Sequence, residues 1–252
     1  MKSNKYERRF YRNWIRAKDL YLTRISVKET DLQILTDKPI EKNFLKERVS
    51  AYRQDIEGYI AKDRRFFTSL KPIPVELHAP AIVRAMAKGA KKANVGPMAA
   101  VAGAIAQYIG KDLLRRGVGE VIIENGGDIF MKTKKIRYLG IYAGRSKLSG
   151  KFSLRIHPAD TPLGVATSSG SVGHSLNFGN ADAVVILGKD ALLADSVATA
   201  TANLVESAND FRKAIDFAKK IPQICGILII LKDNLAIWGK IELVGVAKTK
   251  NA

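Results

Sequence analysis

The sequence predicts an α+β fold in which antiparallel β-hairpins alternate with helices. Short apolar segments rich in β-branched residues recur in close pairs along the chain, as the strands of hairpins do. Between these pairs, apolar residues repeat at helical spacing, most clearly at Leu45, Val49, Tyr52 and Ile56. Single strands do not alternate regularly with single helices, so the pattern does not indicate a βαβ wind.

Composition indicates one domain that spans residues 1–252. Of the 252 residues, 46% are hydrophobic, which is enough to bury a substantial core. Residues 66–74 contain two prolines and form the only plausible internal boundary. The sequence beyond them does not become polar or low in complexity, so no domain linker is predicted there. Residues 1–19 are predicted to form a basic N-terminal arm that also carries aromatic side chains.

The formal charge of +18 and the pI near 9.9 favour anionic ligands and keep nucleic acid among the candidate partners. Beyond the arm, however, the basic residues are scattered over predicted amphipathic helices. They form no arginine-rich array interleaved with aromatic residues. A nucleic-acid-binding protein, whose affinity would fall steeply with salt, is therefore the weakest functional hypothesis.

The predicted location is the cytoplasm. The N-terminus is charged from its start and lacks the apolar region of a signal peptide. No apolar stretch is long enough to cross a bilayer. The single cysteine, Cys225, lies in an apolar run typical of a buried strand, which fits a reducing compartment. The oligomeric state is left open, with a homo-oligomer as one option.

The first half of the chain is predicted to contain a hairpin, a long helix and a helix pair. Residues 21–27 alternate as a strand does, and a turn leads to a second strand through residues 32–34. Apolar spacing predicts a helix over residues 45–62. Residues 80–93 begin with a proline, which suits the first turn of a helix. Residues 99–109 are rich in Ala and Gly, so this helix can pack closely against a sheet or a ligand.

The second half is predicted to contain further hairpins and two helices. Residues 121–123 are expected to form a strand. Residues 129–131 and 136–142 are expected to pair as a hairpin across a lysine-rich turn. A helix is predicted through residues 211–218, capped by one of the polar residues before it. The remaining predicted strands are residues 152–156, 183–187, 224–231 and 235–238, the last two paired as a hairpin.

Residues 164–203 are the segment around which we expect the rest of the chain to be organised. Their first part, GVATSSGSVGHS, gathers Gly, Ser and Thr around His174. Glycine lets the backbone approach a ligand closely, and hydroxyl groups with exposed amides suit phosphate oxygens. The segment has a net charge of −2 (one Lys, three Asp; 1 − 3), which favours a cation-and-phosphate site over a nucleic-acid groove. A Gly/Ser loop followed by an ordinary capped helix explains these residues equally well.

Asp195 and Thr199 lie four residues apart in a segment of helical composition, ALLADSVATATAN. On a helix, their oxygens lie on one face, one turn apart. A carboxylate and a hydroxyl at this spacing can hold a hard cation, and magnesium prefers oxygen ligands. The second candidate is the turn Asn125–Asp128, because a strand that ends in a double glycine is a usual place for ligand contact. Asn-Gly and Gly-Gly are also strong signals for a simple tight turn.

These two segments, Asn-Gly-Gly-Asp and Ala-Asp-Ser-Val-Ala-Thr-Ala, resemble signatures of the ApbE superfamily, the FAD:protein FMN transferases. A closer similarity is to an uncharacterised branch of ApbE-related proteins in archaea and bacteria. It shares the segments KETDL, GPMAAVAGAIA, ENGGDIF, VATSSGSVGHS and ADSVATATAN. The resemblance covers nearly the whole chain. It implies an ApbE, T-fold-like architecture with two sheet-and-helix halves beside a flavin pocket.

The resemblance also implies roles for individual residues. Magnesium would be held by Asp195, Thr199 and the backbone carbonyl of Gly96. The flavin nucleotide, FAD or FMN, would be bordered by Gly126, Gly127, Asp128, Ala166, Thr167, Ser168, Ser169, Gly170 and Met98. The implied activity is magnesium-dependent cleavage of the FAD pyrophosphate with transfer of FMN to a Thr or Ser of a protein acceptor, or hydrolysis of FAD.

The chain departs from the family pattern at two places. Pro97-Met98-Ala99 stands where the family has Lys-Gly-Tyr, and the His-x-x-Asp-Pro-x-Thr-Gly segment is reduced to His174 and the residues after it. His174 and Asp195 are the catalytic candidates, with His174 as the base because its unperturbed pKa lies near neutrality. A structural histidine that holds the Gly-rich loop explains His174 equally well. Because of the departures, a flavin-binding or nucleotide-binding module without catalysis is the second hypothesis.

Overall fold

The computed structural model describes residues 12, 14–170 and 178–246, and it has the predicted α+β architecture. An eight-stranded antiparallel sheet has the order β11-β10-β9-β8-β5-β4-β3-β2, and a second sheet has the order β1-β6-β7-β12. The strands are β1 (Ile15–Arg16), β2 (Tyr21–Val27), β3 (Thr30–Thr36), β4 (Val121–Asn125), β5 (Asp128–Lys132), β6 (Arg137–Gly140), β7 (Phe152–Ile156), β8 (Leu163–Ser168), β9 (Ala183–Gly188), β10 (Ile224–Leu231), β11 (Asn234–Gly239) and β12 (Leu243–Gly245). The helices are α1 (Lys42–Lys62), α2 (Arg65–Thr68), α3 (Ala81–Ala93), α4 (Val101–Arg115), α5 (Ala191–Ala202) and α6 (Phe211–Lys219).

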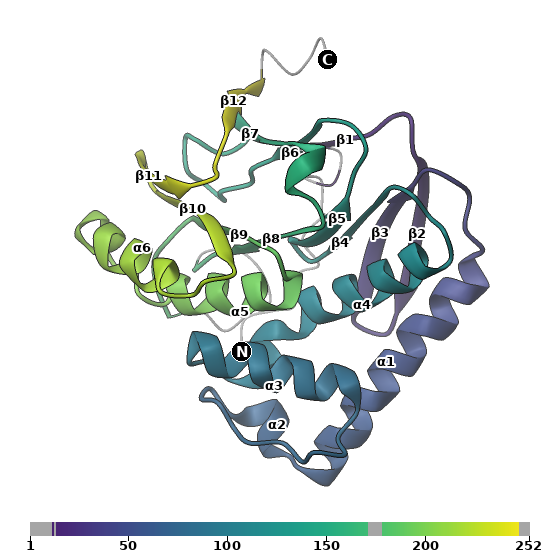
Figure 1. Cartoon of the computed structure of the whole chain (residues 1–252). Helices are drawn as coiled ribbons and strands as arrows, with labels where there is room; N and C mark the ends of the chain where they lie inside the picture. Colours follow the sequence, from purple (N-terminus) through teal and green to yellow (C-terminus); the bar gives the residue numbers. More distant parts are fainter. Residues whose placement is uncertain (1–11, 13, 171–177, 247–252) are drawn as a thin grey trace.

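The large sheet lies between two layers. The helices cover one of its faces, and the four-stranded sheet lies over the other (Figure 1). Two apolar clusters fill the space beneath the helices. A third cluster joins the two sheets and includes Val165 and Val185 of the large sheet with Leu139 and Leu154 of the small one. Because the large sheet is covered on both faces, strands such as β9 and β10 are nearly continuous apolar runs.

The large sheet is built from two halves with the same order of elements. In each half, a hairpin is followed by helices and then by a second hairpin: β2-β3, α1 to α4 and β4-β5, then β8-β9, α5, α6 and β10-β11. The halves meet where β5 runs antiparallel to β8, with Ile129 opposite Val165. This arrangement agrees with the two sheet-and-helix halves that the resemblance implies.

Helices α1 and α5 differ in how they are buried. In α1 the apolar stripe predicted from spacing faces the core, and Leu45, Val49, Tyr52 and Ile56 are buried. Helix α5 is buried along its whole length, from Ala191 to Ala202. A helix enclosed on all sides needs no polar face, and eight of its twelve residues are Ala, Leu or Val. The buried polar side chains of α5, among them Asp195 and Thr199, therefore need hydrogen-bond partners or a ligand.

One predicted pairing is wrong. Residues 129–131 and 136–142 do not form a hairpin, because β5 pairs with β4 and β8, whereas β6 pairs with β1 and β7 in the other sheet. The Gly126-Gly127 turn is a two-residue connection that joins β4 directly to β5. Strand β4 therefore pairs along one edge of β5, and β8 of the second half pairs along the other. The chain after Lys132 must therefore leave the large sheet.

The end of the predicted N-terminal arm belongs to the folded core. Strand β1 pairs with β6, with Ile15 opposite Leu139. Arg12 is only 7% exposed. Asp19 pairs with Arg137 of β6. Arg12, from the predicted basic arm, is thus a counter-charge for Asp31 and Glu124, and Asp19 is a counter-charge for Arg137.

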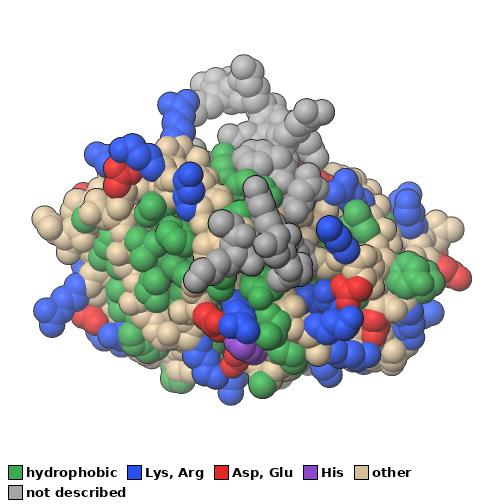
Figure 2. Space-filling model, turned by 90° about the horizontal axis from the view of Figure 1, so that it is seen from above, with side chains coloured by type: hydrophobic (Ala, Val, Ile, Leu, Met, Phe, Trp, Pro, Cys, Tyr) green, Lys and Arg blue, Asp and Glu red, His purple; other side chains and the backbone are tan. Residues whose placement is uncertain are grey.

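None of the helices that the structure describes is long and apolar enough to cross a membrane. Figure 2 shows the face on the side of the four-stranded sheet. On this face, Lys and Arg side chains are spread around the periphery, and Asp or Glu side chains lie between them. The large positive charge of the chain is therefore dispersed here and not gathered into one groove.

Candidate functional site

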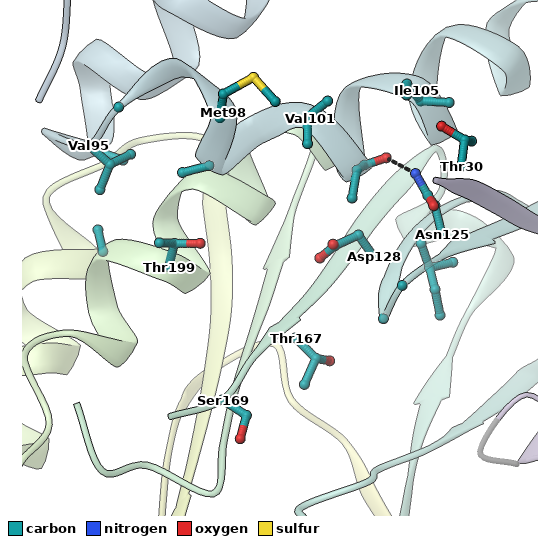
Figure 3. A pocket seen from close by; sticks show the side chains of 18 of the residues that line it. Thr30, Val95, Met98, Val101, Ile105, Asn125, Asp128, Thr167, Ser169 and Thr199 are labelled. Carbon is teal, nitrogen blue, oxygen red and sulfur yellow. Dashed lines mark hydrogen bonds between the residues drawn. The ribbon is translucent and has the colours of Figure 1, made fainter. Parts of the chain in front are cut away.

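A cavity of about 2050 Å³ opens where the two halves meet. Its walls come from the β2–β3 turn, α1, the connector after α2, the β4–β5 turn, the start of α4, strand β8, the second half of α5 and the inner face of the small sheet. Figure 3 shows the polar part of this cavity, with Asp128, Thr167, Ser169 and Thr199 around one space. Much of the remaining wall is apolar. A cavity of this size exceeds the usual volume of a pocket for one drug-sized ligand.

The double glycine forms the tight β4–β5 turn. Gly126 and Gly127 have φ angles of 65° and 103°, in the region that favours glycine. Asn125 and Asp128 lie opposite each other at the base of this turn. The Asn125 side-chain amide donates to the carbonyl of Ala102 at 3.1 Å, which ties the turn to the start of α4 (Figure 3). The turn explains both glycines, and it places Asp128 at the edge of the cavity.

Asp128 is a buried carboxylate at the start of β5. Its Oδ1 atom has no hydrogen-bond partner among the described residues, although the side chain interacts with the backbone of Thr167. Burial raises the pKa of Asp128 well above its usual range, and the neighbouring charges of Asp195 and Glu124 raise it further. An orphaned oxygen on a buried acid is rare and calls for an explanation, such as a water or an ion at this position.

Asp195 comes from the middle of α5 and is 9% exposed. Its Oδ2 atom accepts a hydrogen bond from the backbone N–H of Gly103 at 2.9 Å, and the backbone of Ala102 interacts with it as well. Burial raises the pKa of Asp195 to about 7, and these two hydrogen bonds act in the opposite direction. The positive end of the α4 dipole thus stabilises the ionised carboxylate in part.

The small residues of α4 permit this approach. A Cβ atom on Gly103 would fall 2.4 Å from the carbonyl oxygen of Ala191 and 2.9 Å from Cβ of Asp195. Gly110 lies equally close to the ring of Phe130. The Ala/Gly composition of α4 therefore serves close packing against α5 and the sheet. Through this packing, Asp195 can cap the start of α4.

Thr199 lies one turn after Asp195 on α5. It is 8% exposed and lines the cavity. In Figure 3, the side chains of Thr199 and Asp128 extend toward one another from opposite sides of the cavity. The fold therefore brings together two carboxylates and a hydroxyl, from residues 128, 195 and 199. The sequence analysis paired Asp195 with Thr199 but assigned Asp128 only to the flavin border.

Gly96 and Met98 line the same cavity. Gly96 precedes the short 3₁₀-helix Pro97–Ala100, and its carbonyl accepts a hydrogen bond from the Ala99 N–H at 3.1 Å. A Cβ atom on Gly96 would fall 1.8 Å from the carbonyl oxygen of Ser69, so the connector after α2 requires a glycine here. A carbonyl oxygen has a second lone pair, which leaves Gly96 able to bind a cation as well.

Residues 166–168 are part of strand β8, not of a loop. Because side chains alternate along a strand, Thr167 lines the cavity, as does Ser169 just beyond the strand, while Ala166 packs beneath α5. Ser168 is buried and is not among the residues that line the cavity. Gly170 donates its N–H to Ala181, and a Cβ atom there would fall 1.9 Å from the Gly179 carbonyl. Of residues 166–170, the structure thus brings Thr167 and Ser169 to the cavity.

His174 lies outside the residues that the structure describes, so its predicted role as a base is not addressed by the geometry. Among the described residues, no group of three or more His, Cys, Asp and Glu side chains is arranged to hold a metal. The available donors are two carboxylates, one hydroxyl and one carbonyl. These are all oxygen ligands, which suit magnesium, an ion that keeps several waters and needs few protein ligands.

Sequence analysis missed two residues beside the cavity. Glu124 is 1% exposed, and its Oε1 atom accepts the Gly127 N–H at 2.9 Å. Arg12 forms an ion pair with Glu124 from 112 residues away. Glu124 could have been suspected from the ENGGD segment, which includes it. Arg12 gives no local signal, because its role depends on the tertiary fold.

The fold is that of the ApbE proteins. A flavinyl transferase ApbE from Pseudomonas stutzeri superposes with a TM-score of 0.58 at 12% identity, over 87% of this chain and 94% of that one. The ApbE protein of Thermotoga maritima gives a TM-score of 0.59 at 14% identity, over 91% and 98% of the two chains. The predicted resemblance is confirmed at the level of the fold.

The chain belongs to the family described as AbpE bacteria, whose model matches residues 12–234. Its relatives include a UPF0280 protein of Methanococcus aeolicus, 41% identical over 222 residues, which are 86% of this chain and 90% of that protein. A UPF0280 protein of Methanocaldococcus jannaschii is 42% identical over 234 residues, 89% and 93% of the two chains. The predicted ApbE-related branch is therefore confirmed.

Proposed function

We propose that this protein is a magnesium-dependent, FAD-using enzyme of the ApbE type. Its reaction is cleavage of the FAD pyrophosphate, with transfer of FMN to a Thr or Ser of a partner protein or to water. The observation that supports it is a pair of neighbouring buried carboxylates: Asp128 lines the cavity, and Asp195, which lies behind the lining residues, raises the pKa of Asp128. Among the described residues, neither has a Lys, Arg or His in ion-pair contact, so a cation from solution is the natural counter-charge.

Asp195, Thr199 and the Gly96 carbonyl would hold the magnesium ion, and Asp128 would supply the second negative charge. The chemistry that magnesium supplies when bound is neutralisation of the pyrophosphate and of the charge that develops on it. Asp195 is fixed for this role by the Gly103 N–H at 2.9 Å. Because that hydrogen bond engages Oδ2, the Oδ1 atom is the one we assign to the ion.

Thr167 and Ser169 are placed to bind the nucleotide from β8. Both line the same cavity as Gly127 and Met98, so their hydroxyls can form hydrogen bonds with phosphate or ribose oxygens. Apolar side chains of the neighbouring wall, such as Leu139, would exclude water from an aromatic ring system. Together these residues orient the pyrophosphate for an in-line displacement.

The proposed transfer balances as follows. The acceptor hydroxyl oxygen forms a bond to the phosphorus of the FMN portion, the bridging P–O bond of the pyrophosphate breaks, and AMP leaves with that electron pair. The hydroxyl proton passes to a base, for which His174 is the candidate. With water as the acceptor, the products are free FMN and AMP.

A flavin-binding or nucleotide-binding module is the second candidate, and one observation favours it. Pro97-Met98-Ala99 lies in the short 3₁₀-helix before α4, where the family pattern has Lys-Gly-Tyr. Met98 lines the cavity and brings no charge to it. In this version the protein would hold FAD or FMN and leave the pyrophosphate intact.

The deciding experiment follows AMP release from FAD with and without Mg²⁺, using wild type, Asp195→Asn and Asp195→Ala. Asparagine keeps an oxygen that can accept the Gly103 N–H, so it removes the charge and retains the cap. We expect Asp195→Asn to lose about 100-fold or more of the activity, as for loss of a metal ligand. Asp190→Asn is the matched control, because Asp190 caps the same helix through Leu193 and, unlike Asp195, does not act on the pKa of Asp128.

Metal-dependent AMP release that is lost in Asp195→Asn and kept in Asp190→Asn supports the enzyme. FAD that binds and stays intact in the presence of candidate acceptors supports the binding module. If Asp195→Asn retains full activity and only Asp195→Ala is inactive, Asp195 is a structural cap, and the assignment of the metal site is wrong.

A further inference from the structure

Arg12 lies outside every motif that the sequence analysis identified. We propose that Arg12 is a positioning residue: through Glu124, it holds the Gly126-Gly127 turn in the geometry that the nucleotide and its cation require. This inference rests on the proposed function for the identity of the ligand. The contacts among Arg12, Glu124 and Gly127 are the same whichever ligand binds.

One carboxylate links Arg12 to the turn. Arg12 Nε donates to Oε2 of Glu124, while Oε1 of the same group accepts the Gly127 N–H at 2.9 Å. Glu124 is therefore held by one oxygen and holds the turn with the other. Because Glu124 is 1% exposed, bulk solvent has little access to either contact. We therefore expect a change at Arg12 to reach Gly127 through this carboxylate.

Arg12 is itself held in place by β3. Its Nη1 donates to Oδ2 of Asp31 at 3.0 Å, and its Nη2 donates to the Asp31 carbonyl at 2.7 Å. Its own carbonyl accepts from the Gln33 side-chain amide at 3.1 Å. All three guanidinium nitrogens are thus used in one planar arrangement. A lysine could supply the charge but not these directions.

The position of the turn matters because Asp128 follows it directly. Gly127 also lies against Thr167, since a Cβ atom on Gly127 would fall 3.5 Å from the Thr167 carbonyl. Asp128 and Thr167 are both in the cavity wall. A shift of the turn would therefore move the carboxylate and widen the gap to β8 at the same time. Small displacements of such a site are costly to ligand affinity.

The chain contains a matched control for loss of a buried arginine. Arg137 is 4% exposed and pairs with Glu120, which is 2% exposed, and neither residue lines the cavity. Arg137→Met and Arg12→Met should both lower thermal stability, because each leaves a buried carboxylate without its partner. Only Arg12→Met should affect the site.

The test measures FAD affinity by flavin fluorescence in the presence of Mg²⁺, at a temperature where all variants are folded. We expect Arg12→Met to weaken binding roughly 10-fold to 100-fold, as for other residues that orient a ligand-binding group. Arg12→Lys should be weakened as well, and Arg137→Met should stay within about twofold of wild type. In a double-mutant cycle, Arg12→Met is combined with Glu124→Gln. Because both changes break the same connection to Gly127, the double variant should lose no more FAD affinity than the weaker-binding single variant.

Amide exchange of Gly127, followed by NMR, provides a readout without FAD. We expect exchange to be roughly fivefold or more faster in Arg12→Met, as for loss of about one hydrogen bond, and unchanged in Arg137→Met. If Arg12→Met matches Arg137→Met in both measurements, the inference is overturned. If wild type binds no FAD but Gly127 responds as expected, the proposed function fails and the positioning role stands.

Discussion

Glu120 and Asp128 are both buried carboxylates close to β4, and they differ in what lies beside them. Glu120 accepts hydrogen bonds from Arg137 Nε and from the Thr133 hydroxyl, both at 2.6 Å. Asp128 has an oxygen without a partner and lies near a second acid, Asp195. A chain with a formal charge of +18 has many cations to spare. Among the described residues, none of them nevertheless forms an ion pair with Asp128 or Asp195.

The presence or absence of a counter-charge distinguishes an acid that stabilises the fold from an acid that is available to bind a ligand. A buried acid that serves the fold carries its counter-charge within the chain, because burying an unpaired charge is costly. A buried acid that waits for a ligand raises the free energy of the empty protein and recovers it on binding. The two groups of acids should therefore respond in opposite directions to substitution, to pH and to Mg²⁺.

The largest expected effect is a loss of stability when Glu120, the acid with a counter-charge, loses its partner. Arg137→Met should lower the free energy of unfolding by about 3–5 kcal/mol, because it leaves Glu120 as an uncompensated buried charge. Urea denaturation at neutral pH measures this value. A loss below about 1 kcal/mol would show that Glu120 finds another partner and would remove the contrast.

The second effect is a dependence on pH that only the cavity acids should produce. The pKa of Asp195 in the folded protein is about 7, above the value of about 3.9 for an unfolded aspartate. Between these values the folded state binds more protons than the unfolded state, so stability falls as the pH rises from about 4 to about 7.

Without Mg²⁺, the free energy of unfolding should therefore decrease by about 2 kcal/mol between pH 5 and pH 7 and be level above that. The two acids titrate together, so the midpoint belongs to the pair. Asp195→Asn should flatten this profile. Mg²⁺ should restore stability at pH 8 in wild type and not in Asp195→Asn, because only a bound ligand stabilises the folded state. A profile identical in both proteins would contradict the assignment.

The smallest effect is expected from Asp128→Asn in the absence of Mg²⁺. Removal of one of two neighbouring buried charges should stabilise the protein by about 1 kcal/mol. In saturating Mg²⁺ the gain should disappear or reverse, because the variant binds the cation less tightly. Thermal unfolding with EDTA and with Mg²⁺ gives both values. Destabilisation with EDTA would mean that Asp128 has a structural role.

Much of the fold could be predicted from the sequence, because local patterns determine local structure. The apolar spacing from Leu45 to Ile56 gave helix α1, and the alternation in residues 21–27 gave strand β2. The β5–β6 pairing was predicted wrongly for the same reason, since neighbours in the sequence were assumed to be neighbours in the sheet. The pairing of β5 with β8 depends on contacts between the two halves, which no local pattern specifies.

The candidate site was predicted in part. Asp195 and Thr199 lie one turn apart on α5, so their spacing alone places them together. Residues 166–168 were assigned to a loop by resemblance, and the alternation of a strand decides that only Thr167 of these three reaches the cavity. Sequence spacing could not show this, because Gly, Ser and Thr occur in both settings.

The sequence by itself determined the class of fold, the order of its elements and the ApbE-related family, because these depend on periodic patterns and on motifs that can be read along the chain. Only the tertiary structure decided which charges meet. It brought Asp128 to Asp195 across 67 positions and Arg12 to Glu124 across 112 positions. Electrostatic energies depend on distance in space and on burial, and neither is fixed until the two halves and the second sheet have packed together.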